Sequence, residues 1–80
     1  MAKRAVMFTF PKEVVAQPVI YNLGQQYRVV TNVRRADVSE RRGWVVLELQ
    51  GKDDDIENAL AWVASVGVRV DAIGGEISAG

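Results

Sequence analysis

The sequence contains neither cysteine nor histidine among its 80 residues. The absence of cysteine excludes disulfides, thiolate nucleophiles and zinc sites built on thiolates. The absence of histidine removes the commonest acid–base group near neutral pH and the commonest transition-metal ligand. No serine therefore has a histidine to activate it, and no glycine-rich phosphate loop is present. We expect a protein that is not an enzyme and holds no cofactor.

An excess of positive charge is also lacking, because ten basic residues are balanced by ten acidic ones. Binding to nucleic acid or to an anionic membrane usually depends on a basic excess. No apolar run approaches the roughly 20 residues that a membrane-spanning helix needs. No long apolar segment follows the basic start Met1–Arg4, so no signal peptide is expected. These features predict a cytoplasmic protein without a membrane span and without a nucleic acid partner.

Hydrophobic residues make up 49% of the chain, which is enough for one core. The length predicts a single domain over residues 1–80, with its core in about 5–73 and a flexible tail over 74–80. A chain this short buries a limited fraction of its surface and has little stability to spare. Pairing with a second copy would relieve this shortage, so a homodimer is expected.

The hydrophobic periodicity changes several times along the chain. Apolar runs and alternation predict strands, and apolar residues at helical spacing predict helices. One helix is expected to begin with Pro18 at its first position and to pack through Ile20, Leu23, Gly24 and Tyr27. A second is expected to begin with Asp53 as its N-cap and to stop at Gly67. The predicted order is strand 5–10, helix 18–27, strand 29–38, polar turn 39–43, strand 44–49, helix 53–66 and strand 68–73.

This order is the βαββαβ pattern of an α+β, ferredoxin-like fold, a four-stranded antiparallel sheet with two helices on one face. If Leu47 and its alternate neighbours face the helices, Trp44, Val46 and Glu48 lie on the open face, the side of the sheet away from the helices. We interpret Trp44 and Val46 as the dimer interface, because sizeable exposed apolar patches mark interaction sites. The alternative is that they are ordinary scattered surface hydrophobics.

Two kinds of charge cluster have a functional and a structural interpretation. The run Asp53-Asp54-Asp55 lacks the interleaved spacing of a calcium loop and fits the start of a helix, so no metal site is expected. The pairs Arg34-Arg35 and Arg41-Arg42 suit a phosphate site in residue type. Neighbours in a regular strand point to opposite faces, however, so solvated surface charge is the favoured interpretation. RNA binding would need stacking aromatics on the central strands, and the matching signature is missing.

Several short motifs resemble the NIL domain family. Thr9-Phe10-Pro11 followed by Gln17-Pro18-Val19-Ile20 is similar to its opening strand and proline-started helix. Asn32-Val33-Arg34 lies where the Asn-Ile-Leu motif of the family falls. Gly43–Gly51 is similar to its G-x-L-x-x-E-L-x-G segment, and 56–62 with 67–71 is similar to its last helix and strand. The resemblance covers residues 5–73 and implies the same ferredoxin-like topology.

The resemblance also implies a function. Such domains occur at the C-terminus of ATPase subunits of methionine importers, where they dimerise and bind methionine, and ahead of ferredoxins in proteins of sulfur amino-acid synthesis. This chain resembles the second group more through Phe10-Pro11-Lys12 and Arg35-Ala36. No cluster-binding cysteines follow its last strand, so it either stands alone or is a piece cut before a ferredoxin.

By this resemblance, Asn32, Val33 and Arg34 are the candidate ligand-binding residues. An amide side chain can donate to a carboxylate and accept from an ammonium group; the alternative is that Asn32 bonds local backbone. Arg34 replaces an apolar residue of the motif and would offer a counter-charge to a ligand carboxylate. The expected function is regulatory binding of an amino acid, methionine first. The alternative is a ligand-free dimerisation or docking module for an iron–sulfur or sulfur-transfer partner.

Overall fold

The structure, a computed structural model, describes residues 1–38 and 43–73. Residues 39–42 of the turn expected over 39–43, and the tail expected over 74–80, lie outside the described residues, whereas Gly43 belongs to a strand. The predicted order of strands and helices is confirmed. The elements are β1 (Ala2–Phe10), α1 (Ala16–Gln26), β2 (Val29–Val38), β3 (Gly43–Gly51), α2 (Asp53–Ser65) and β4 (Arg69–Ala72).

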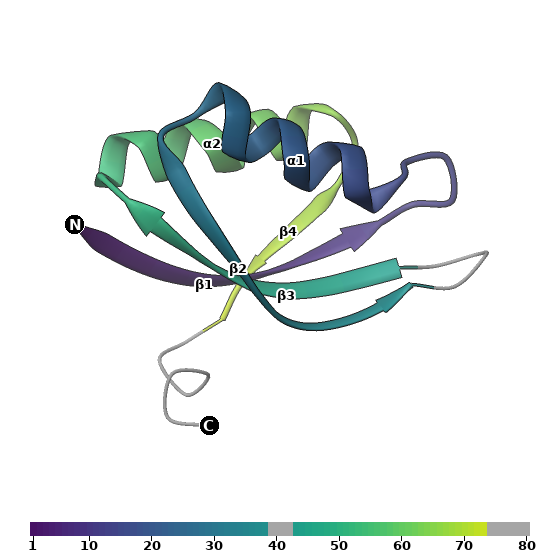
Figure 1. Cartoon of the computed structure of the whole chain (residues 1–80). Coiled ribbons are helices and arrows are strands. Elements are labelled where there is room, and N and C mark those ends of the chain that lie inside the picture. Colours follow the sequence, from purple (N-terminus) through teal and green to yellow (C-terminus); the bar gives the residue numbers. More distant parts are fainter. Residues whose placement is uncertain (39–42, 74–80) are drawn as a thin grey trace.

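The four strands form one sheet in the order β2-β3-β1-β4, and all neighbouring strands are antiparallel. Both helices lie on the same face of this sheet (Figure 1). The predicted α+β, ferredoxin-like fold is therefore confirmed. In the part of the chain that the structure describes, neither helix is long and apolar enough to cross a membrane.

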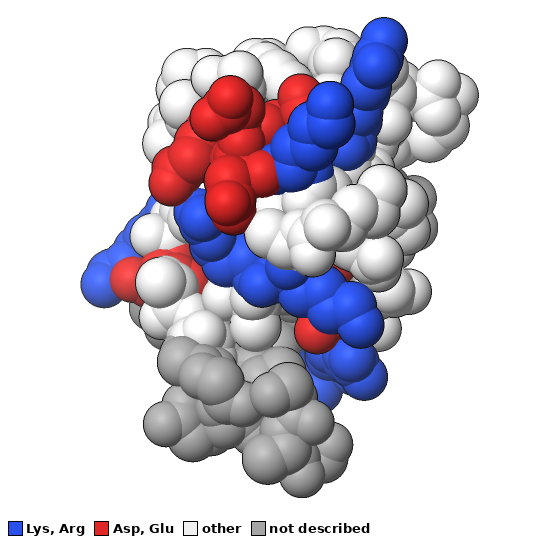
Figure 2. Space-filling model, turned by 90° about the vertical axis from the view of Figure 1, so that its left-hand side faces the viewer, with Lys and Arg blue, Asp and Glu red and all other residues white. Residues whose placement is uncertain are grey.

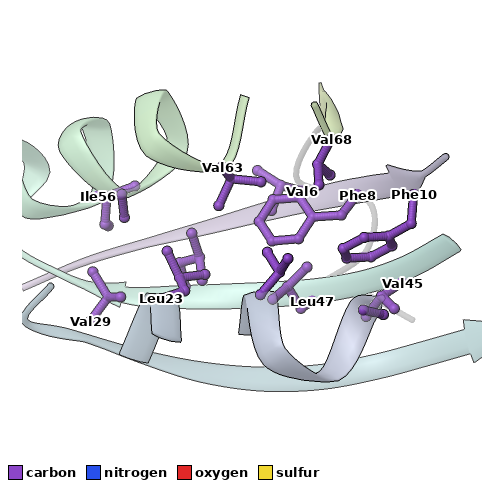
Figure 3. Packing of buried hydrophobic residues seen from close by; sticks show 14 residues of the cluster. Val6, Phe8, Phe10, Leu23, Val29, Val45, Leu47, Ile56, Val63 and Val68 are labelled. Atoms are coloured by element: carbon purple, nitrogen blue, oxygen red, sulfur yellow. The ribbon is translucent and has the colours of Figure 1, made fainter. Parts of the chain in front are cut away.

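The core lies between the helices and the sheet, and alternate residues of the two central strands line it. Val6, Phe8 and Phe10 of β1 are at most 3% exposed. The rings of Phe8 and Phe10 pack edge to face, with their centroids 6.2 Å apart. Figure 3 shows these side chains pointing toward the helices, where apolar side chains of α1 and α2 meet them. The other members of this cluster are Ala16, Val19, Leu23, Val29, Val45, Leu47, Leu49, Ile56, Ala59, Val63 and Val68.

Helix α1 packs through a stripe that agrees in part with the predicted one, since Leu23 is buried and Ile20 and Tyr27 pack against the core. Ala16, Val19 and Leu23 are buried, whereas Gly24 is exposed and a Cβ added to it would have no atom within 4 Å. The prediction that Gly24 lies on the packing face was wrong, because the stripe is centred on Val19 and Leu23 and so turns Gly24 toward solvent. The helix also begins two residues before Pro18, still within the first turn, where proline is tolerated.

Helix α2 begins at Asp53, and Lys52 occupies the N-cap without a side-chain cap bond. The interpretation of Asp53 as the N-cap was therefore wrong by one residue. The three aspartates in the first turn still favour the helix, since negative charge is stabilising near its positive end. Gly67 lies just beyond the helix with a φ of 96°, a left-handed conformation that glycine adopts without steric cost and that ends the helix as predicted.

Gly51, the last residue of β3, lies against the backbone where β2 begins. A Cβ placed on Gly51 would come within 2.7 Å of the carbonyl oxygen of Arg28. Glycine at this position therefore allows a close approach of two backbone segments.

Candidate functional site

The open face of the sheet carries the residues that sequence analysis selected. Val45, Leu47 and Leu49 of β3 are at most 2% exposed and face the helices, so their alternate neighbours lie on the open face. Residues paired across antiparallel strands share a face, which extends this assignment to the other strands. The open face carries Val30, Asn32, Arg34, Arg35 and Asp37 of β2, Trp44, Val46, Glu48 and Gln50 of β3, Lys3, Ala5, Met7 and Thr9 of β1, and Arg69 and Asp71 of β4.

Strand β2 contains a β-bulge within the predicted ligand-binding segment. Val33 pairs with Leu47, but the next pair joins Arg35 to Val46, so Arg34 is an extra residue without a partner in β3. A bulge of this kind interrupts the alternation of side chains. Arg35 shares the open face with Val46, and Arg34 lies there as well because it forms an ion pair with Glu48. The argument that Arg34 and Arg35 point to opposite faces assumed a regular strand, and the bulge removes that condition.

Glu48 is a buried carboxylate on the open face. It is 8% exposed, and its Oε1 atom lies 3.6 Å from Nη2 of Arg34, whose side chain remains half exposed. This separation exceeds the usual 2.7–3.2 Å of an N–H···O hydrogen bond, so the pair is a loose one. Asn32 pairs with Glu48 across the two strands. An amide, a cation and a carboxylate thus lie together at this point of the open face.

The three predicted ligand-binding residues do not all lie together. Asn32 and Arg34 are brought together on the open face beside Glu48. Val33 pairs with Leu47 and therefore belongs to the helix side of the sheet, where it is 53% exposed beyond the edge of the core. A ligand on the open face would contact the side chains of Asn32 and Arg34 but not that of Val33.

Trp44 and Val46, the predicted dimer residues, both lie on the open face and pair with Thr9 and Met7 of β1. Val46 is only 8% exposed and Trp44 is half-buried, so much of their surface is covered within the chain itself. A more exposed apolar side chain of the open face lies on β2, where Val30 is 58% exposed. The role of Trp44 and Val46 as a dimer interface stays a prediction.

Glu48 was given no functional role from the sequence alone, and Arg35 was interpreted as solvated surface charge. Glu48 was placed on the open face, and its isolated charge between Leu47 and Leu49 is a signal that it needs a partner. No comparable signal in the sequence indicates that Arg34 and Arg35 lie on the same face, because that placement depends on the bulge.

Of the aspartate run 53–55 considered from the sequence, Asp53 has a basic partner, and the pair Arg41-Arg42 lies outside the described residues. On the side of the molecule that Figure 2 shows, an acidic group lies beside a band of basic side chains. Arg4 of β1 forms ion pairs with Asp53 at 3.9 Å and with Glu57 at 2.9 Å. Within residues 1–38 and 43–73, no group of three or more acidic side chains is placed to hold a metal ion.

The aromatic residues of β1 are not available for stacking on a ligand. Phe8 and Phe10 are 0% and 3% exposed and face the helices, so β1 presents Ala5, Met7 and Thr9 to the open face. Sheets of this fold that bind RNA stack bases on aromatic side chains of the central strands. On the open face the central strands offer only Trp44 for this purpose.

Comparison with known proteins gives one family and one fold. The family model of the NIL domain matches residues 4–72. No curated protein matches the chain. Among solved structures, the chain is similar to the C-terminal domain of an ABC transporter ATP-binding protein from Enterococcus faecalis, with 21% sequence identity and a TM-score of 0.77. That match covers 90% of this chain and 84% of the other, and it shows that the two share a fold.

Proposed function

This chain belongs to the NIL domain family, and on that premise we propose that it is a non-enzymatic regulatory module that binds a small free amino acid, methionine first. The site is the open face around Asn32 and Arg34, and the module acts in the cytoplasm as a homodimer. The family membership, and a solved relative of the same fold within a transporter ATP-binding protein, support a regulatory role.

The observation that carries this proposal is the group formed by Asn32, Arg34 and Glu48. A free amino acid carries a carboxylate and an ammonium group close together. The guanidinium of Arg34 suits the carboxylate, the buried carboxylate of Glu48 suits the ammonium, and the amide of Asn32 serves either. The loose 3.6 Å contact between Arg34 and Glu48 leaves hydrogen-bonding capacity for such a ligand.

Titration calorimetry with L-methionine tests the proposal, with L-leucine for comparison. Saturable heat is expected with methionine, and the Asn32→Ala variant is expected to bind about tenfold more weakly, since it loses a hydrogen bond to a charged group. Gln25→Ala is the matched control, because it removes an exposed amide from α1 on the far side of the sheet. The proposal fails if millimolar methionine gives no heat, or if both variants lose affinity equally.

The dimer is proposed to form through the open face at Trp44 and Val46. A ligand bound beside this contact would act by favouring one dimer arrangement, and only to the extent that it binds that arrangement more tightly. Val46 lies beside the Asn32–Glu48 pair on the open face. This proximity supports a link between ligand binding and the dimer arrangement.

Replacing Trp44 and Val46 together by serine is expected to convert the dimer to a monomer in sedimentation velocity. The physical reason is the loss of apolar area at the contact, while the helix side of the sheet is untouched. Val66→Ser is the control, because Val66 is a partly exposed apolar residue beyond the end of α2. A dimer that persists in the double variant, with circular dichroism showing an intact fold, would contradict the assignment.

A ligand-free docking module for an iron–sulfur or sulfur-transfer partner is the second candidate. The observation that favours it is the outer edge of β2, where Val30 and Val33 are 58% and 53% exposed. Exposed apolar strand edges are ready templates for pairing with another chain. Absence of methionine heat, together with an unchanged dimer in the Asn32→Ala variant, would move this candidate to first place.

A further inference from the structure

The bulge in β2 gives two consecutive arginines an orientation that a regular strand does not allow. Because Arg34 has no partner in β3, the alternation is reset and Arg35 lies on the same face, opposite Val46. Both side chains are exposed and project from the free edge of the sheet. Bulges are enriched next to functional sites, where they re-aim side chains.

The two arginines differ in their acidic neighbours. Arg34 lies 3.6 Å from the buried carboxylate of Glu48, with which it forms a loose ion pair. Among the described residues, no carboxylate lies within 4.0 Å of the Arg35 guanidinium; Asp37, two residues further along the same face, is the next acidic group on the strand. The guanidiniums of Arg34 and Arg35 therefore carry one more positive charge than Glu48 neutralises.

We propose that Arg34 and Arg35 form an oxyanion clamp that binds the phosphate or carboxylate group of a small molecule lying on the open face. A guanidinium presents its N–H groups as a planar fork that matches such groups, and two forks on one face hold an oxyanion from two directions. Glu48 attracts the first fork to the open face, and their 3.6 Å separation, too long for a hydrogen bond, leaves the N–H groups of Arg34 free to bind the ligand.

The neighbouring side chains define the rest of the ligand. Val46 pairs with Arg35 on one side and with Met7 of β1 on the other. Trp44 lies two residues before Val46 on the same face. Because Trp44 and Val46 also form the proposed dimer contact, the uncharged part of the ligand is expected to be small enough to leave this apolar strip to the partner. The clamp shares Arg34 with the proposed amino acid site but needs no ammonium group on its ligand. A small acid without an amino group is therefore expected to bind as well.

The test is a nuclear magnetic resonance titration of the intact chain at low ionic strength and neutral pH, observing the arginine side-chain Nε–Hε signals. Inorganic phosphate is one probe and succinate is the other. Both Arg34 and Arg35 signals are expected to shift with saturation, and added sodium chloride is expected to weaken binding because exposed charges are screened. The probe that binds more tightly assigns the clamp to a phosphate or to a carboxylic acid.

Matched variants separate a clamp from general surface charge. Arg35→Gln is expected to weaken binding of the better probe about tenfold, because a charge-assisted hydrogen bond is lost. Arg69→Gln makes the same change in charge on the same face but at the opposite edge strand, and is expected to leave binding nearly unchanged. Both replaced side chains are exposed, so neither substitution is expected to prevent folding.

Asn32→Ala separates the clamp from the amino acid proposal. If the clamp exists, this variant keeps its affinity for phosphate or succinate even where it loses methionine. Equal losses in Arg35→Gln and Arg69→Gln would overturn the clamp, since they would show attraction by net charge alone. Absence of any shift at the Arg34 and Arg35 signals in tens of millimolar of either probe would overturn it too.

Discussion

Replacing Phe8 by alanine is expected to lower the free energy of unfolding by about 3–5 kcal/mol. Phe8 is fully buried, lies in a central strand and packs its ring edge-on against Phe10. Truncation removes the burial of the ring and leaves a cavity that the rigid sheet below cannot fill. A domain of 80 residues has a total stability of about 4–12 kcal/mol, so this one change removes a large share of it.

Urea denaturation followed by the fluorescence of the two tryptophans measures this effect. Phe8→Leu is the graded control, because leucine keeps much of the volume and is expected to cost less than the alanine. Thr9→Ala is the positional control, since the next residue along β1 points to the open face. Similar denaturation midpoints for Phe8→Ala and Thr9→Ala would contradict the assignment of the core to the helix side of the sheet.

Replacing Gly51 by alanine is expected to lower the free energy of unfolding by about 1–3 kcal/mol, the usual cost of overpacking. The new Cβ would lie 2.7 Å from the carbonyl oxygen of Arg28, which belongs to the backbone and cannot rotate away. The first residues of β2 would have to move, and with them Val29, a buried member of the core. The measurement is the same urea denaturation.

Gly24→Ala is the matched control for this substitution. Gly24 lies on the exposed side of α1 with no atom within 4 Å of an added Cβ, and alanine favours a helix over glycine by about 1 kcal/mol. The same chemical change is thus expected to stabilise the chain at position 24 and destabilise it at position 51. Stabilisation at both positions would show that β2 adjusts without cost, and destabilisation at position 24 would contradict the exposed placement of that glycine.

The sequence predicted those features that follow from periodicity. A period of two in β3 correctly separated Leu47 and Leu49 from Trp44 and Glu48, because a regular strand alternates its side chains. In α1 the prediction was right for Leu23, which is buried, and for Ile20 and Tyr27, which pack against the core, but wrong for Gly24. Glycine has no side chain whose burial would mark its face of the helix.

The candidate site was less accessible to prediction, because its geometry depends on an irregularity. The bulge at Arg34 arises from how β2 pairs with β3, and a rule based on strict alternation places Arg35 on the wrong face. Asn32 and Glu48 meet only through the register of the same two strands. Residue types therefore suggested the participants, whereas the strand pairing decided which of them lie together.

The strand order has a consequence for how the chain folds. β1 is synthesised before the other strands, yet its partners follow much later in the sequence: Ala2 pairs with Gly51 and Val6 with Ala72. The hairpin of β2 and β3 is local and is expected to form early, whereas β1 can pair only after β3 and β4 have been synthesised. Pairings of such high sequence separation slow folding, since loop-closure entropy must be overcome first. Until then Val6, Phe8 and Phe10 remain uncovered, so the nascent chain is most prone to aggregation through its first strand.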